Sequence, residues 1–387
     1  MKISSRVNLD GIERLLDSHF QMPRATLEVP SVLMFGGALG LDASLLLAVA
    51  TWARSDMARE LRVRVLSEHL ESHLESLTKT LYGTAAVYFS DKLKDIQGMP
   101  IGRRQALSYA TNMVDAMYKA KYSSIVRGQT INLFCLRGAE REFVQGLYEM
   151  EMDGGVRSRK DFRSLLSDLL ETCAPGRKYN SIRSKMADPM GELAYELFKN
   201  TDDHALVDPL GNMYQKHLRG LTVRLRSINK NDIPKITGNS TGASPYFGKR
   251  LLSNAGRATL SFFEMSVYDT GPGLARRWLS HEREEPCIDL DTVSLSDEIN
   301  AVTKCFLKNS TTKNSASSGQ GLDLVTSLLW RHSGFLRVRT GRLCLFQSFD
   351  SNKANEGFAP QPWHGKRQLQ AVQGTAFTVC IPFAEVA

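Results

Sequence analysis

The spacing of apolar and polar residues predicts an alternation of strands and helices in the first part of the chain. Residues 25–35, 60–67 and 130–136 have the alternating or short apolar runs that are typical of strands. Residues 42–55, 68–82 and 103–123 carry apolar residues at helical spacing, and Asp42 is placed to cap the first of these helices. We therefore expect a small α/β domain of unknown role, regulatory or partner-binding, over residues 1–155.

The amino-acid composition changes around residues 151–185. This stretch is rich in Gly, Pro, Ser and basic residues, with one short helical pattern inside it. Such segments commonly separate domains. We expect a linker with a short helix over residues 156–184 and a second domain over residues 185–387.

The second domain has a different order of elements. A helix is predicted over 188–206, with Asp188 as its cap and Pro189 in its first position. Strands are predicted over 221–228 and 258–269, with a polar loop between them, followed by a helix over 321–332. A hairpin and a last strand over 375–383 complete the pattern.

Composition narrows the class of protein only moderately. The chain has 387 residues, a formal net charge of +8 and six cysteines without a CxxC pair, so a zinc or redox motif is not indicated. The N-terminus lacks the apolar segment of a signal peptide, and the best apolar run, residues 43–53, is too short to span a bilayer. We expect a soluble, cytoplasmic protein that does not associate with membranes.

One segment of the second domain is strongly basic. Between residues 216 and 250 the only acidic residue is Asp232, whereas eight residues are basic: Lys216, Arg219, Arg224, Arg226, Lys230, Lys235, Lys249 and Arg250. Such a segment can meet a nucleic acid, or it can be an ordinary solvated strand and loop.

Three polar residues share one face of the helix predicted over 188–206. Glu196, Asn200 and Asp203 stand at i, i+4 and i+7. A carboxamide beside a carboxylate offers oxygen ligands for Mg²⁺, which is usually shared with phosphates, and a nearby Glu can deprotonate a water molecule. A solvated helix face is the ordinary alternative.

The sequence "YDTGPGL" at residues 268–274 places a carboxylate at the end of a strand and two glycines directly after it. Asp269 can accept a hydrogen bond from an exocyclic amine such as N6 of adenine. Gly271 and Gly273 have no Cβ, so a flat ring can approach the backbone closely. A tight turn is the alternative interpretation.

A third polar stretch, residues 308–325, leads through Gly319-Gln320-Gly321 into a helix. Backbone N–H groups of a glycine-rich turn at a helix N-terminus form an anion site, and Lys304, Lys308 and Lys313 can add charge. A flexible linker before an ordinary helix is the alternative. Thr375, which follows Gly374 in the last strand, can bond adenine directly or through water.

Taken together, these pieces resemble the GHKL ATPase superfamily of type II topoisomerase ATPase subunits, the large heat-shock chaperone, histidine kinases and MutL proteins. "ELFKNTDDHA" resembles the family's N box, "DTGPGL" its first glycine box, and "GQGLDLV" its second, with the lid before it. "HSGFLRVRTG" and "GTAFTVCIP" resemble the closing hairpin and last strand. The resemblance covers roughly residues 185–385. It implies a Bergerat-type α/β sandwich, a mixed and mostly antiparallel sheet with helices on one face.

The resemblance also implies ATP and Mg²⁺ as ligands and assigns roles by position. Glu196 would activate water, Asn200 would ligate Mg²⁺, and Asp203 would line the pocket beside them. Asp269 would recognise adenine with help from Thr375. The remaining ATP-binding residues would be Gly271, Gly273, Lys308, Lys313, Gly319, Gln320, Gly321 and Leu322.

Three departures from the family pattern affect the expected activity. Asp323 stands where the second glycine box often has another Gly. No domain that could supply a phosphate-binding Lys follows the last strand, so hydrolysis is expected to be slow or to need a partner or the N-terminal domain. The polar insertion at 229–257 has no counterpart in the motif set.

The function expected first is a slow Mg²⁺-dependent ATPase that acts as a conformational switch, with ATP, a homodimer mate or another protein as partner. The alternatives are a protein kinase acting on Ser or His of a partner, and an ATP-binding module without turnover. His69 and His73 stand at i and i+4, but the sequence after them lacks the proline of a phospho-accepting helix. We expect them to lie on an ordinary charged helix.

Overall fold

The computed structural model of the chain contains two β-sheets with helices packed on them, which confirms the expected α/β class. The structure describes residues 1–23, 26–30, 32–33, 39–55, 58–64, 69–150, 154–176, 180–208, 210–238, 240, 242–253, 259–307, 321–350, 357–365 and 367–383. Among these residues, no helix combines the length and apolar character needed to cross a bilayer.

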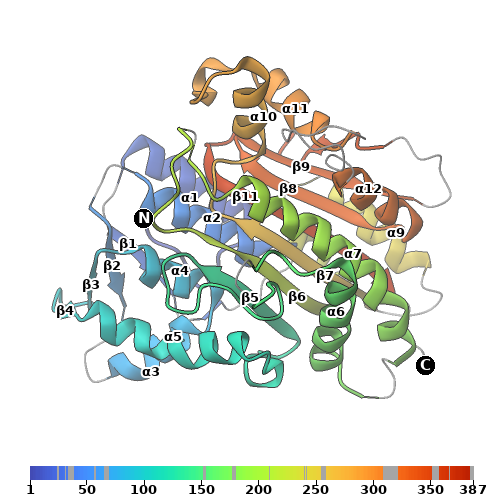
Figure 1. The fold of residues 1–387 in the computed structure, drawn as a ribbon. Helices are drawn as coiled ribbons and strands as arrows, with labels where there is room; N and C mark the ends of the chain where they lie inside the picture. The colour runs from blue at the N-terminus through green and yellow to red at the C-terminus, as the bar shows by residue number, and fades with distance from the viewer. Residues whose placement is uncertain are drawn as a thin grey trace.

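The smaller sheet lies at the left of Figure 1 and has the order β1-β2-β3-β4. Its strands are β1 (Thr26–Val29), β2 (Glu60–Val63), β3 (Lys92–Lys94) and β4 (Pro100–Ile101). The first three are parallel, and β4 is antiparallel to β3. The helices of this half are α1 (Leu9–Gln21), α2 (Leu41–Ala53), α3 (Leu70–Thr78), α4 (Leu81–Phe89), α5 (Arg103–Tyr118) and the short η2 (Tyr122–Ser124).

The larger sheet has seven strands in the order β10-β9-β8-β11-β7-β6-β5, and every pairing in it is antiparallel. Its strands are β5 (Thr130–Leu136), β6 (Leu218–Asn229), β7 (Thr259–Asp269), β8 (Phe335–Gly341), β9 (Leu343–Ser348), β10 (Gln361–Pro362) and β11 (Val372–Phe383). The helices of this half are α6 (Arg159–Cys173), α7 (Asn180–His204), α8 (Ile233–Thr237), α9 (Ala243–Ser253), α10 (Leu274–Arg283), α11 (Leu295–Lys304), α12 (Gly321–Arg331) and the short η4 (Leu290–Thr292).

The larger sheet is covered on both faces, so the expectation of helices on one face was wrong. Directly opposed residues of neighbouring strands share a face, and the faces alternate along each strand. Arg219 and Asp269 are opposed and face α7, whose Asp202 lies 3.6 Å from Arg219. Arg224 belongs to the alternate set and forms an ion pair with Asp42 of α2. Figure 1 shows α6 and α7 in front of the sheet, with α1 and α2 behind it.

The second face is unusual because its docking surface is charged as well as apolar. Arg337 and Arg339 of β8 are buried, and Arg339 forms an ion pair with Glu13 of α1 at 2.9 Å. Arg337 donates to the Ser44 hydroxyl of α2 at 3.0 Å. The Leu39 and Gly40 backbone N–H groups donate to the buried Glu264 carboxylate of β7. These contacts join the N-terminal helices to strands of the larger sheet, so the helices form a layer of the same fold.

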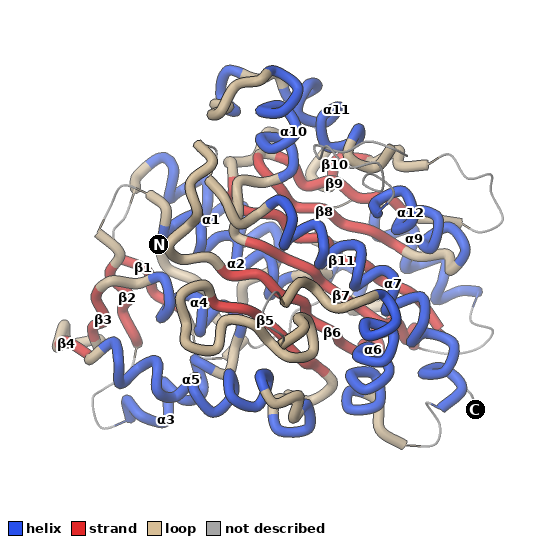
Figure 2. The backbone as a smooth tube through the Cα atoms, in the orientation of Figure 1, coloured by secondary structure: helices blue, strands red, loops and turns tan. Residues whose placement is uncertain are grey.

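The expected boundary near residue 155 falls inside this continuous arrangement. β5 precedes it but pairs with β6 over its whole length (Figure 2). One cluster of buried apolar side chains joins residues of α2 to residues of β7 and β11. The change of composition around residues 151–185 does not mark a domain boundary, because the buried apolar core continues across it.

The segment expected to be a linker is mostly helical. α6 has 15 residues and begins with a capping box in which the Ser158 side chain and Asp161 bond reciprocally. α7 begins at Asn180, so Pro189 lies inside the helix, not at its first position. Packing against α6 explains why the helix continues through the proline, since tertiary contacts override one lost hydrogen bond.

Two further helical predictions were wrong in detail. The single helix expected over 68–82 is divided at residues 79–80 into α3 and α4. The polar insertion between β6 and β7 contains α8 and α9, and Phe247 of α9 packs on Phe262 and Phe335. α9 thus covers the sheet on the same side as α2, since Phe335 opposes Cys380 and Cys380 opposes Glu264.

Candidate functional site

The predicted strand-end carboxylate, Asp269, is the last residue of β7 and is 5% exposed. The Gly271 backbone N–H donates to its Oδ1 at 2.8 Å. Thr375 of β11 lies directly opposite, and the Thr375 and Thr340 hydroxyls are 3.1 Å apart. Burial raises the pKa of Asp269 to about 7, against the smaller opposing effects of the Gly271 N–H and of Arg54. The structure therefore brings together one buried carboxylate and two hydroxyl groups at one end of the sheet.

The two glycines after Asp269 are required by close contacts. A Cβ on Gly271 would lie 2.6 Å from the carbonyl oxygen of Ala205, just after α7. Gly273 has a φ of +91°, and a Cβ there would lie 3.0 Å from the Thr340 hydroxyl. Gly273 also caps α10. These glycines let the strand end turn tightly against α7 and β8.

Arg54 joins this group from the other half of the chain. It is the C-cap of α2, and its guanidinium donates to the Thr270 carbonyl oxygen and lies 3.8 Å from the centre of the Tyr214 ring. Its positive charge acts on Asp269 and opposes the rise of that residue's pKa. No local pattern in the sequence marks Arg54, because its partners are more than 150 residues away.

A second group forms where α7 meets the start of α12. Glu196 is buried, and three apolar residues on the neighbouring side of α7, Leu193, Leu197 and Phe198, are fully buried. The Asn200 side-chain N–H donates to the Glu196 carbonyl oxygen at 2.9 Å. A Cβ on Gly321 would lie 2.6 Å from Glu196 Oε2 and 3.6 Å from Asn200 Nδ2. An alanine at this position would displace the end of the Glu196 side chain from the first turn of α12.

The Glu196 carboxylate also has a cationic partner, Arg159, which lies in the segment that we expected to be a linker. The Arg159 guanidinium of α6 lies 2.5 Å from Glu196 Oε1. Burial raises the pKa of Glu196, and Arg159 limits that rise. A carboxylate with a raised pKa next to a helix N-terminus has the properties of a general base.

The other predicted site residues are placed as follows. Asp203 forms an ion pair with Lys199 at 2.8 Å, one turn after Asn200. Leu322 is buried in the first turn of α12. Asp323 lies in the same turn, where a negative charge suits the helix dipole. Lys308, Lys313, Gly319 and Gln320 lie outside the described residues.

The two groups lie along the same helix. Gly271 contacts Ala205 at the end of α7, whereas Gly321 contacts Glu196, nine residues earlier. At a rise of about 1.5 Å per residue, the contact points are about 13 Å apart along the helix axis. The Asp269 end carries a buried acceptor, and the Glu196 end carries the N-terminus of α12.

The donor set allows a shared cation but not a protein-only metal site. Among the described residues, no group of three or more His, Cys, Asp or Glu is arranged to hold a metal ion. The Asn200 amide N–H is engaged with Glu196, so its oxygen Oδ1 is the atom that a cation would use. Mg²⁺ bound there would complete its shell with water and phosphate oxygens.

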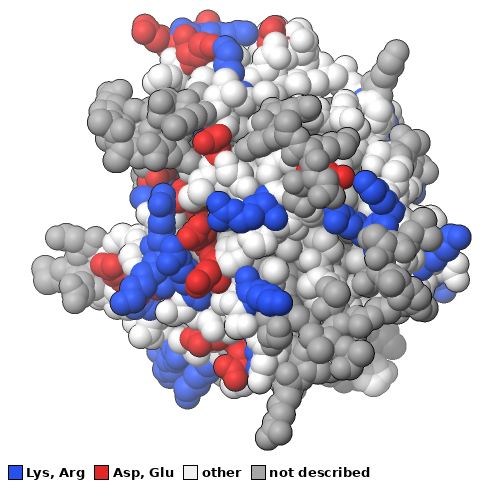
Figure 3. Space-filling view, turned by 90° about the vertical axis from the view of Figure 1, so that its right-hand side faces the viewer, with Lys and Arg blue, Asp and Glu red and all other residues white. Residues whose placement is uncertain are grey.

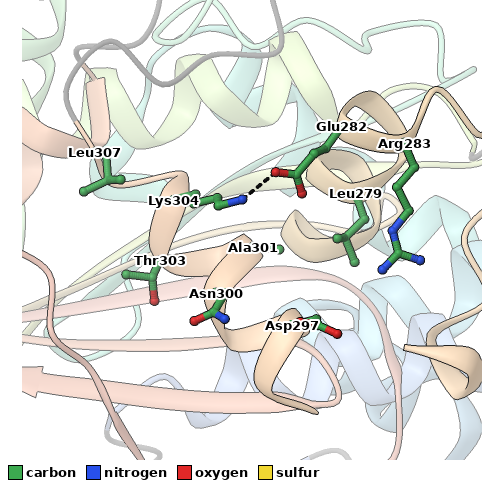
Figure 4. Close-up of a pocket in the computed structure, with 9 residues that line it drawn as sticks. All are labelled: Leu279, Glu282, Arg283, Asp297, Asn300, Ala301, Thr303, Lys304 and Leu307. Carbon is green, nitrogen blue, oxygen red and sulfur yellow. Dashed lines mark hydrogen bonds and ion pairs between the residues drawn. The ribbon is translucent and has the colours of Figure 1, made fainter. Parts of the chain in front are cut away.

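A separate cavity of about 280 Å³ lies between α10 and α11 (Figure 4). Lys304 and Glu282 form an ion pair of 2.5 Å across it, and Leu279 and Ala301 form its apolar floor. Lys304, which we expected to add charge to the anion site, lines this cavity and pairs with Glu282, whereas the other predicted site residues that the structure describes lie outside its lining.

The basic segment does not form one positive surface. Arg219 and Arg224 are buried and contact acidic residues inside the protein. Three further basic residues of the segment, Lys216, Lys235 and Lys249, also contact an acidic residue. The face drawn in Figure 3 shows Lys and Arg side chains and, on its left-hand side, Asp and Glu side chains among them. The charge left for a polyanion is smaller than the sequence indicated.

Comparison with known proteins places the chain in no group. It matches no family model, no curated protein and no solved structure.

Proposed function

We propose that this protein binds ATP in the manner of GHKL ATPases, through a Bergerat-type domain, and hydrolyses it slowly with Mg²⁺ as a conformational switch. The observation that carries the proposal is the pair of groups along the C-terminal part of α7, one at Glu196 and the other at Ala205, just after the helix. One group has a buried carboxylate, Asp269, beside two glycines that let the turn pack closely against α7 and β8. The other has Glu196, Asn200 and the start of α12 in contact. Their separation along the helix suits an extended nucleoside triphosphate.

The adenine end would work by hydrogen bonding. Ionised Asp269 accepts a hydrogen bond from the exocyclic amine, and the Thr375 hydroxyl assists directly or through water. Gly271 and Gly273 let the chain turn directly after Asp269 and so keep this carboxylate at the end of the strand. The Gly271 backbone N–H donates to Asp269 Oδ1 and so fixes the orientation of the carboxylate.

The phosphate end would work by charge and proton transfer. Backbone N–H groups of Gly321 and Leu322 at the start of α12 bind phosphate oxygens. Asn200 Oδ1 would hold Mg²⁺, which neutralises phosphate charge when bound. Glu196 accepts a proton from water as the water oxygen bonds the γ-phosphorus. The bond from that phosphorus to the β–γ bridging oxygen breaks, and its electron pair leaves with ADP.

The test of turnover is phosphate release from ATP by the full chain with Mg²⁺. Wild type is compared with Glu196→Gln and with Glu192→Gln, a more exposed carboxylate one turn earlier. We expect release by wild type and Glu192→Gln and a loss of about 100-fold or more in Glu196→Gln. Transfer of label from ATP to a protein without phosphate release would replace the ATPase by a kinase. Binding without either product would leave an ATP-binding module.

The proposed partner that responds to the nucleotide state is a homodimer mate, another protein or a nucleic acid. The N-terminal layer is the part of the chain placed to transmit that state, because Arg54 of α2 touches the turn after Asp269.

A further inference from the structure

Two ion pairs, one helical turn apart, connect α6 to α7. Arg159 pairs with Glu196 and Arg163 pairs with Glu192, each at 2.5 Å. Both helices contribute residues four positions apart, which lie on one face of each helix. The helices approach closely at Gly191, where a Cβ would lie 2.5 Å from the Arg163 Cα. Close backbone contact between the two helices therefore holds both ion pairs in place.

The two ion pairs differ in the exposure of their carboxylates. The Glu192 side chain is 24% exposed, whereas the Glu196 side chain is 7% exposed. Glu196 Oε1 faces Arg159, and Oε2 is the atom that a Cβ on Gly321 would meet. The Glu196 carboxylate is thus held between α6 on one side and the start of α12 on the other.

The groups around Glu196 have opposing effects on its charge. Burial and the nearby Glu192 raise the pKa of Glu196, and Arg159 is the cation that opposes them. From α12 the carboxylate meets the helix N-terminus, with Asp323 in its first turn. On α7 itself the next polar groups are Lys199, paired with Asp203, and the Asn200 amide.

We propose that Arg159 is a positioning residue for Glu196: it orients the ionised carboxylate toward the start of α12, where a water molecule would be activated. The proposal rests on the proposed function for the reaction, but the ion pair itself can be tested without ATP. Arg159 acts from α6, and its guanidinium also lies 5.4 Å from the centre of the Tyr195 ring, which helps to fix it. Arg163 provides a matched control in the same helix.

The first experiment measures the coupling between Arg159 and Glu196 without ATP. Urea denaturation of the full chain compares wild type with Arg159→Ala, Glu196→Gln and the double variant, and the same cycle is measured for Arg163 and Glu192 as the control. We expect Arg159→Ala to cost less stability in the Glu196→Gln background than in wild type, and Arg159→Lys to retain part of the coupling. Equal losses in both backgrounds would overturn the proposal, because Arg159 would then not act on the Glu196 carboxylate.

The second experiment measures turnover in the same variants. Arg159→Ala should lower kcat near pH 7 by about tenfold, with KM for ATP nearly unchanged and the acid limb of the kcat profile moved to higher pH. A raised KM with an unmoved acid limb would overturn the proposal, because Arg159 would then bind the nucleotide. If wild type releases no phosphate, the proposed hydrolysis fails, while the stability cycle still decides whether Arg159 acts on Glu196.

Discussion

Replacing Asp269 by Asn should stabilise the protein, and the gain should depend on pH. The Asp269 carboxyl is 5% exposed, and burial raises its pKa to about 7 from an ordinary value of 3.8. Asparagine keeps an acceptor oxygen for the Gly271 N–H but carries no charge. The substitution therefore removes the unfavourable charge while leaving the local hydrogen bond possible.

The size of the effect follows from the two pKa values. Each pKa unit corresponds to about 1.4 kcal/mol, so a carboxyl moved from 3.8 to about 7 costs the folded state about 4 kcal/mol once it is ionised. Because the folded state binds the proton more tightly, wild type loses stability as pH rises from 3.8 to about 7 and then levels off. The asparagine side chain of the variant does not titrate. The gain in free energy of unfolding should thus be about 2 to 3 kcal/mol larger at pH 8 than at pH 5.

The assay is urea denaturation of wild type and Asp269→Asn at both pH values, with the slope m compared to confirm the same transition. The control is Asp91→Asn at an exposed carboxyl whose pKa is lowered, despite an opposing effect of burial, by its pairing with Arg59 and Lys216. That variant should show no gain at pH 8. An equal change at both pH values, or a loss of stability in Asp269→Asn, would refute the assignment of a high pKa to Asp269.

Further predictions follow from the same contacts. ATP affinity, measured by calorimetry, should fall about tenfold for each pH unit below about 7, because the adenine amine requires ionised Asp269; a flat profile would contradict this. Gly321→Ala should lose about 1 to 3 kcal/mol of stability in denaturation, since its Cβ would meet Glu196, whereas Gly248→Ala, which points into open space, should gain about 0.5 to 1 kcal/mol. Glu13→Gln should lose about 3 to 5 kcal/mol by leaving Arg339 buried without its charge partner, and a loss below about 1 kcal/mol would show that the N-terminal layer docks weakly.

The sequence predicted individual elements well where one physical signal dominates. The strand at 130–136 has the predicted bounds, and β7 ends at Asp269 as expected. Alternation of apolar residues determines such strands locally. The same signal could not reveal that β5 belongs to the larger sheet, because strand pairing depends on residues about 90 positions away.

Contacts among the candidate site residues were predicted in part for the same reason, and their roles stay predictions. Glu196 and Asn200 follow from helical spacing, and the structure places Gly321 against both. Arg54 and Arg159 could not be predicted, since each reaches the site through helix packing rather than through a local motif. The burial of arginines on the second face of the larger sheet could not be predicted, because the sequence does not distinguish a buried arginine from a solvated one.

The most direct test of the account is equilibrium binding of ATP and GTP to the full chain with Mg²⁺, for wild type and Asp269→Asn. We predict that wild type binds ATP and discriminates against GTP, whose ring presents an oxygen where adenine presents the amine that donates to Asp269. Asp269→Asn should bind ATP at least about tenfold more weakly while remaining folded and more stable. Absence of ATP binding by folded wild type, or equal binding of ATP by both proteins, would contradict the central claim that Asp269 and the start of α12 define a nucleotide site.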